Sequence, residues 1–125
     1  MAVKTIIRVS DFNRSIHFYN NILKFLIIET WNEGDAKGCI LKIENTSFIE
    51  IQKIDSTNKR YHPSYNEKIP ANKIELQIRT QDMAILTSSL NGAKWPFQGP
   101  EKKPRGTEYL YTKDPRWLFR YFLSG

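Results

Sequence analysis

The chain has 125 residues, a length that suits one compact domain with a single core. Hydrophobic residues make up 40% of it and charged residues 26%, a balance that excludes an intrinsically disordered chain. A single cysteine, Cys39, excludes an intrachain disulfide and a thiolate metal cluster. No apolar stretch approaches the roughly 20 residues that cross a bilayer. We therefore expect a cytoplasmic protein with no membrane partner.

The chain is basic: 19 Lys and Arg against 13 Asp and Glu give a net charge of +6. Such a field favours anionic partners of any kind. A nucleic-acid binder usually concentrates its basic residues on one helix or stripe. Here they are spread along the sequence, apart from Lys59-Arg60 and Lys102-Lys103-Pro104-Arg105. The distribution disfavours nucleic acid, although a module that binds nucleic acid or protein through these basic segments is kept as an alternative.

The first half of the chain predicts one strand, one helix and three strands. Val3 to Val9 is rich in β-branched residues and ends at Ser10-Asp11, either of which can cap a helix. From Asp11 to Leu23, apolar residues recur every three or four positions, as one helix face requires. Residues 25–31, 37–43 and 48–54 follow as strands separated by turn-forming residues.

The second half repeats this pattern after a polar segment, residues 55–72, that contains two prolines and reads as a connecting loop. A strand is expected at 73–79, and a helix from Gln81 or Asp82 through Leu90, closed by the left-handed-tolerant pair Asn91-Gly92. Further strands are expected at 94–98, 108–113 and 118–123. The prediction is therefore one domain, with module one at about 1–54 and module two at about 73–125.

Two βαβββ units of this size cannot bury their sheets separately. Packed side by side, they would form one curled mixed sheet with the helices on its outer face. The fold class predicted is α+β, and the concave face between the modules is the usual place for a small-molecule site.

Two segments carry a resemblance to a known family. Val9-Ser10-Asp11, followed by Ser15 to Phe25, resembles the "VxD…SxxFYxxxLGF" opening of the vicinal-oxygen-chelate superfamily, which includes glyoxalase I, extradiol dioxygenases and the bleomycin and fosfomycin resistance proteins. Gly106 to Pro115 is similar to its "wGtxxxxxxDPdGn" close. The resemblance spans essentially the whole chain and implies the paired-module fold.

Members of this superfamily that use a divalent metal take one ligand from each of four strands. The resemblance places these slots at Lys4, Glu50, Lys73 and Tyr121. Only Glu50 is a usable ligand, because a protonated ammonium has no lone pair and repels a cation. We therefore expect no metal and no other cofactor.

The chain departs from the family pattern at two turns. Lys24 stands where a helix-ending glycine is usual, and Arg116-Trp117 replaces the usual Asp-Gly. A side chain at such positions adds backbone strain, so we expect a shifted cap at Lys24 and a different turn after Pro115. The register of the last strand is then open to a slip of one residue, which would move Tyr121 to the opposite face.

Strand alternation gives an independent view of the predicted cavity, because successive side chains point to opposite faces of a sheet. In the strand expected at 73–79, the apolar residues Ile74, Leu76 and Ile78 would pack against the helix. The polar residues that alternate with them would then face the cavity. The same parity applied to all strands predicts a ligand-binding face made of Lys4, Arg8, Glu50, Gln52, Lys73, Glu75, Gln77 and, depending on the register, Tyr121.

Three interpretations of this face are open. The charges could neutralise one another in a hydrated groove or a dimer interface, with Glu50 between Lys4 and Lys73. Alternatively, Lys4, Arg8 and Lys73 could bind an anion, with Glu50 and Glu75 orienting them. Catalysis by Glu50 as a general base is the least favoured, because two nearby cations stabilise its ionised form and weaken it as a base.

The function that we predict is metal-free binding of a small molecule, anionic or aromatic, by a homodimer. The positive charge argues against a cationic ligand, and the many aromatic residues suit planar ones. A metal-dependent lyase or dioxygenase of the same superfamily is the enzymatic alternative.

Overall fold

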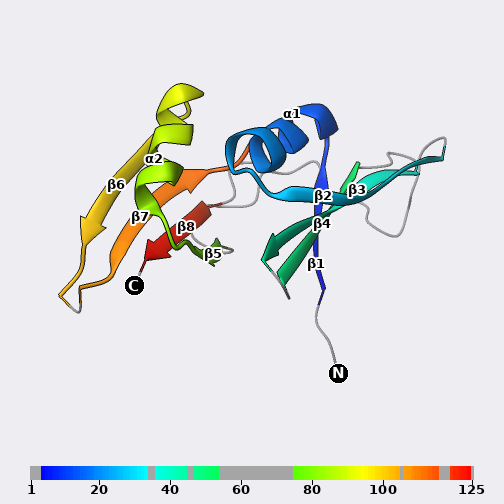
Figure 1. The fold of residues 1–125 in the computed structure, drawn as a ribbon. Coiled ribbons are helices and arrows are strands. Elements are labelled where there is room, and N and C mark those ends of the chain that lie inside the picture. Colours follow the sequence, from blue (N-terminus) through cyan, green and yellow to red (C-terminus); the bar gives the residue numbers. More distant parts are fainter. Residues whose placement is uncertain are drawn as a thin grey trace. The chain divides into compact units, whose positions relative to one another are not determined.

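A computed structural model describes residues 4–33, 36–44, 47–53, 75–104, 106–115 and 119–124, without the side chains of residues 44, 75 and 119–124. The chain forms two compact units, Met1–Lys68 and Ile69–Gly125. Figure 1 shows a helix and a four-stranded sheet in each. The predicted linker at 55–72 lies outside the described residues.

The first unit has the predicted element order, βαβββ. Its elements are β1 (Thr5–Val9), α1 (Phe12–Ile16), which continues as the π-helical segment η1 (His17–Ile22), β2 (Leu26–Glu33), β3 (Ala36–Glu44) and β4 (Ser47–Lys53). The strand order is β1-β4-β3-β2; β1 runs parallel to β4 and the other neighbours are antiparallel. The sheet is therefore mixed, with the first and last strands of the unit side by side.

The helix begins and ends at residues that the sequence singled out. The Oδ1 of Asp11 accepts a hydrogen bond from the backbone N–H of Arg14 at 3.1 Å, which is a helix N-cap. Lys24 ends the helix with φ +67°, so the predicted shift of the cap is wrong: the lysine adopts the left-handed conformation itself. The side-chain amide of Asn20 donates to the carbonyl of Phe25 at 2.7 Å and ties down the chain beyond the strained residue.

The core of the first unit lies between this helix and one face of the sheet. Alternate residues of β1 and β4 supply the sheet side, with Ile7 and Ile51 both almost completely buried. Phe18 and Tyr19 supply the helix side; their rings meet edge to face with centroids 5.0 Å apart. The residues that alternate with Ile7 in β1 and with Ile51 in β4 therefore face away from the helix, and Glu50 is among them.

The second unit repeats the topology. Its elements are β5 (Glu75–Arg79), α2 (Met83–Gly92), β6 (Phe97–Lys102), β7 (Glu108–Lys113) and β8 (Phe119–Ser124), in the strand order β5-β8-β7-β6 with β5 parallel to β8. Asp82 caps α2 by accepting from the backbone N–H of Ile85 at 3.0 Å. The fold-class prediction of two βαβββ modules is confirmed; a common cavity between them stays a prediction.

Two details of the second unit differ from the prediction. The strand expected at 94–98 is β6, displaced toward the C-terminus, because a bulge between Gln98 and Glu101 lets an edge strand continue past Pro100. The pair Asn91-Gly92 does not supply the left-handed closure of α2. Lys94 does, with φ +55°.

The register of the last strand is set by two neighbours. Tyr121 lies opposite Tyr111 of β7 and Gln77 of β5. The turn expected at Arg116-Trp117 lies outside the described residues. Within the described part of the chain, no helix is long and apolar enough to cross a membrane.

Candidate functional site

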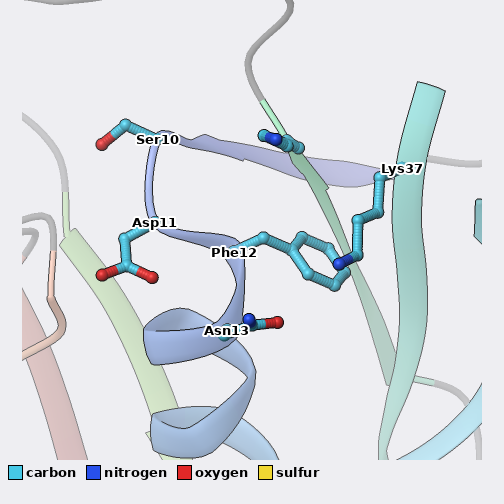
Figure 2. A pocket seen from close by; sticks show the side chains of 6 residues that line it. Ser10, Asp11, Phe12, Asn13 and Lys37 are labelled. Atoms are coloured by element: carbon cyan, nitrogen blue, oxygen red, sulfur yellow. The ribbon is translucent and has the colours of Figure 1, made fainter. Parts of the chain in front are cut away.

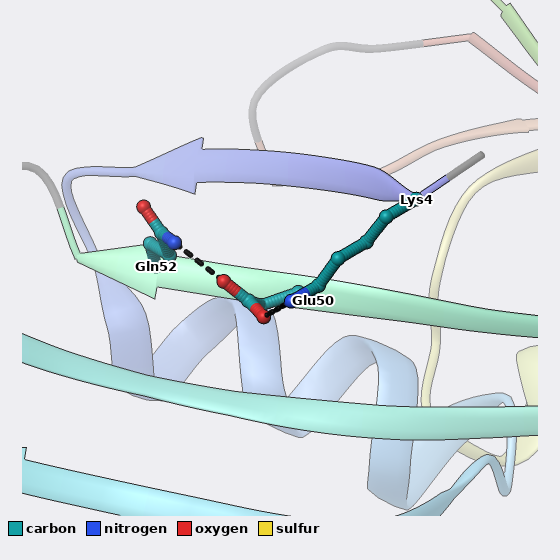
Figure 3. Close-up of polar contacts among 3 residues, drawn as sticks. All are labelled: Lys4, Glu50 and Gln52. Carbon is teal, nitrogen blue, oxygen red and sulfur yellow. Dashed lines mark hydrogen bonds and ion pairs between the residues drawn. The ribbon is translucent and has the colours of Figure 1, made fainter. Parts of the chain in front are cut away.

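The sheet face turned away from the helix in the first unit carries a buried carboxylate, Glu50, at its centre (Figure 3). The Nζ of Lys4 lies 2.5 Å from Glu50 Oε1. The side-chain amide of Gln52 donates a hydrogen bond to Glu50 Oε2. Both carboxylate oxygens are thus held by donors, one of them a cation.

Strand register explains why these three side chains meet. In the parallel pair of β1 and β4, Ile6 lies opposite Glu50 and Arg8 opposite Gln52. Lys4, two residues before Ile6, shares its face and reaches along the strand to the carboxylate. A carboxylate that is only 6% exposed carries a large desolvation cost, which the ammonium and the amide offset. The predicted grouping of Lys4, Glu50 and Gln52 is therefore observed.

An indole ring closes one side of this group. A Cβ added to Gly38 would lie 2.7 Å from Cε2 of Trp31, so the indole lies directly on the Gly38 backbone. Gly38 is opposite Gln52 in the β3–β4 ladder, which places Trp31 on the Glu50 face. In the sequence, Trp31 is only one of many aromatic residues. The available signal was a glycine inside a strand, which often marks a close approach.

Exposed apolar side chains surround the polar centre. Ile6 and Phe48 are 37% and 42% exposed, and both lie on the Glu50 face by alternation. Leu26, 63% exposed, lies opposite Lys42, which lies opposite Phe48, so the register places it on this face as well. The face therefore combines a charged centre with an apolar border, the arrangement of many small-molecule sites.

For the other predicted site residues, the structure gives only the strand position or the burial. Arg8 is half-buried on the Glu50 face, and Gln77 is exposed in β5. Glu75 begins β5, opposite Phe119, and Tyr121 lies two pairs further along the same ladder, opposite Gln77. Lys73 lies outside the described residues. Nothing therefore places Lys73 beside Glu50, and the charge-neutralising partner that the structure does show is Lys4.

The second unit holds a separate aromatic cluster. The rings of Tyr109 and Tyr111 stack with centroids 6.3 Å apart, and the Nζ of Lys103 lies 5.9 Å from each centroid. Lys103 also forms an ion pair with Glu101 at 3.3 Å. The hydrogen bond to Glu101, followed by that to Tyr111, raises the pKa of Lys103 above its ordinary value. This exposed ammonium therefore remains charged in neutral and mildly basic solution.

Cys39 is the one cysteine of the chain, and it is buried, with 1% of its surface exposed. Burial raises the pKa of the Cys39 thiol from 9.0 to about 11. Since the thiolate is the reactive form, Cys39 has no chemistry to offer at neutral pH.

The metal site that the fold implies does not fit the residues around Glu50. Divalent metals in this class of site need several carboxylate, imidazole or amide-oxygen ligands. Here the nearest neighbours of the carboxylate are an ammonium and a donating amide N–H. Over the described ranges, His, Cys, Asp and Glu side chains nowhere gather in a group of three that could hold an ion.

Neither protein-family profiles nor curated protein sequences match the chain. Solved structures do. A glyoxylase/bleomycin resistance protein/dioxygenase domain from Frankia sp. EAN1pec has a TM-score of 0.76 at 16% identity, with coverage of 100% of this chain and 91% of that one. The fosfomycin resistance protein FosX from Listeria monocytogenes gives 0.74 at 14%, covering 100% and 93%. The antibiotic-binding protein TnmS3 from Streptomyces sp. CB03234 gives 0.69 at 14%, covering 99% and 96%. The chain therefore shares the fold of these solved structures, that of glyoxalase/bleomycin resistance protein/dioxygenase domains.

Proposed function

We propose that the chain binds a small anionic or aromatic molecule on the Glu50 face of its first unit, without a metal ion. One observation carries the proposal: both oxygens of the buried Glu50 carboxylate are engaged by Lys4 and Gln52. A carboxylate compensated in this way is a structural anchor for its donors. It is not poised to coordinate a cation or to remove a proton from a substrate.

The charges around this anchor suit an anionic group. The side chain of Lys4 is 58% exposed, so its ammonium keeps N–H donors for a ligand while one side contacts Glu50. Arg8 lies on the same face, and a guanidinium can bind a carboxylate or phosphate with two parallel hydrogen bonds. The net charge of +6 attracts anions to the whole molecule.

The apolar border suits the rest of such a ligand. Trp31 offers an indole edge beside Gln52, and Phe48 and Ile6 offer exposed apolar surface on the same face. Aromatic and aliphatic groups of this kind bind planar organic molecules. The description of TnmS3 as an antibiotic-binding protein supports small-molecule binding as a function of this fold. A cytoplasmic homodimer remains part of the proposal, and sedimentation analysis tests the dimer.

Calorimetry with three matched probes tests the ligand class: benzoate, which is anionic, benzamide, which is neutral, and benzylammonium, which is cationic. We expect benzoate to bind more tightly than benzamide and benzylammonium not to bind. Phe48→Ser should weaken benzoate binding about fivefold, since it removes one apolar contact from the site. Ile85→Ser, which changes another exposed apolar residue, in α2 of the second unit, is the matched control and should have no effect.

Two results would overturn the proposal. One is that no probe binds. The other is that the purified protein retains a transition metal in stoichiometric amount and loses it in the Glu50→Gln variant. That second result would favour a metal-dependent lyase or dioxygenase.

A further inference from the structure

The helix side of the first unit contains a cavity, where β1 ends and α1 begins (Figure 2). Its volume is about 420 Å³, and it is open to solvent. Its lining residues are Ser10, Asp11, Phe12, Asn13, Lys37 and Lys53. Gly38 and Gln52 belong to the Glu50 face, so their chain neighbours Lys37 and Lys53 belong to the opposite face. This cavity is therefore separate from the site proposed above.

Two lysines oppose each other at this cavity. Gly38 lies opposite Gln52, and the same antiparallel register, continued by one pair, puts Lys37 opposite Lys53. Like charges that are directly opposite on neighbouring strands destabilise a sheet. Among the described residues, neither ammonium forms an ion pair. Both lysines line the cavity, and within the described part of the chain no carboxylate pairs with either ammonium.

Asp11 is the carboxylate among the described residues that line the cavity, and it is engaged elsewhere. Asp11 accepts the hydrogen bond that caps α1, from the N–H of Arg14. Figure 2 shows its side chain on the other side of the turn from Lys37. Lys37 instead extends across the ring of Phe12, with its Nζ 5.0 Å from the ring centroid, and Asn13 lies just below that ring. The ring holds the half-buried lysine in place and leaves its ammonium at the cavity.

We propose that this cavity is an anion site that binds the phosphate group of a small molecule. Two ammonium groups act as point charges and suit a doubly charged phosphate. The amide of Asn13 can add a hydrogen bond, and Phe12 supplies an apolar wall for whatever the phosphate carries. Binding would also relieve the repulsion between Lys37 and Lys53. The source of the phosphate is either the free ion or an organic ester.

Titrations of the ¹⁵N-labelled protein with inorganic phosphate and with phenyl phosphate, each at constant ionic strength with sodium chloride, test the site. We expect saturable shifts of the backbone amides of residues 10–13, 37 and 53. Tighter binding of phenyl phosphate would assign an aromatic ester to the site, and equal binding would assign the phosphate group alone; both support the proposal. Lys53→Gln should weaken binding about tenfold, because a charged hydrogen-bond donor is lost.

Lys102→Gln is the matched control, since it removes an exposed lysine from the second unit and should leave binding unchanged. Lys53 is exposed at the end of its strand, and removing one of two like charges should leave the fold at least as stable, which urea unfolding checks. Absence of saturation, equal weakening by Lys53→Gln and Lys102→Gln, or shifts confined to the Glu50 face would each overturn the site. Benzoate binding on the Glu50 face can succeed or fail independently.

Discussion

The ion pair between Lys4 and Glu50 is unequal, because the lysine side chain is 58% exposed and the glutamate side chain only 6%. The ammonium can return to water if the pair is broken, whereas the carboxylate cannot. The energetic consequence of losing each partner should therefore differ. This asymmetry also indicates that the buried Glu50 carboxylate depends on the ion pair more than the exposed Lys4 ammonium does.

Lys4→Met should lower the free energy of unfolding by about 1–3 kcal/mol, because it leaves a buried carboxylate with only the Gln52 amide. Glu50→Gln should cost about 1 kcal/mol or less, because Lys4 is then solvated. Urea unfolding of both single variants and the double variant measures the difference. The double variant should be more stable than the sum of the single effects predicts. An equal or reversed order of the two single variants would contradict the asymmetry.

Gly38→Ala should destabilise the first unit, because its new Cβ would lie 2.7 Å from Cε2 of Trp31 and 2.9 Å from the carbonyl oxygen of Ile51. One of these neighbours is backbone and cannot move cheaply, so a loss of about 2–3 kcal/mol is expected. Tryptophan fluorescence should shift as the indole is displaced. Gly92→Ala is the matched control: no atom lies within 4 Å of its added Cβ, and a change of glycine to alanine at a helix end should be neutral or stabilise slightly. Equal losses in the two variants would show that the Trp31 contact is not the cause.

Lys24→Gly should raise stability by about 1 kcal/mol, because Lys24 adopts φ +67°, a conformation that glycine reaches without a Cβ penalty. Lys24→Ala removes the same side chain but keeps the Cβ, so it should give no such gain. Thermal unfolding of the two variants separates backbone strain from loss of the lysine side chain. A gain of the same size in both would attribute the effect to the side chain.

The sequence predicted the elements of each unit because its periodicities are strong and its caps are local. Asp11 and Asp82 cap the two helices as their positions indicate. The position of β6 was predicted wrongly, because local sequence patterns alone do not determine it. Pro100 argues against a strand. The segment is a strand because it pairs with β7 through a bulge, and local propensity does not reveal that bulge.

The candidate site was predictable in part for the same reason. Alternation places Glu50 and Gln52 on one face of β4, and the pairing of β1 with β4 adds Lys4 to that face. The contact of Trp31 with Gly38 depends on the register of β2 against β3, which includes a shift between Ile27 and Glu29 that alternation does not predict. The opposition of Lys37 and Lys53 likewise appears only when the register is known.

The raised pKa of Cys39, about 11, gives a pH dependence whose sign follows from burial. In the unfolded chain the thiol loses its proton near its ordinary pKa of 9.0, whereas the folded chain keeps it up to about pH 11. Stability from the buried neutral thiol is therefore complete below about pH 9 and declines between about pH 9 and 11. Cys39→Ala should lack this decline in urea unfolding measured across that range. Alkylation of the native protein by iodoacetamide at pH 8 should be about a hundredfold slower than that of the urea-unfolded chain, since both the thiolate fraction and access are reduced. Rapid labelling of the native protein would contradict the buried, protonated state.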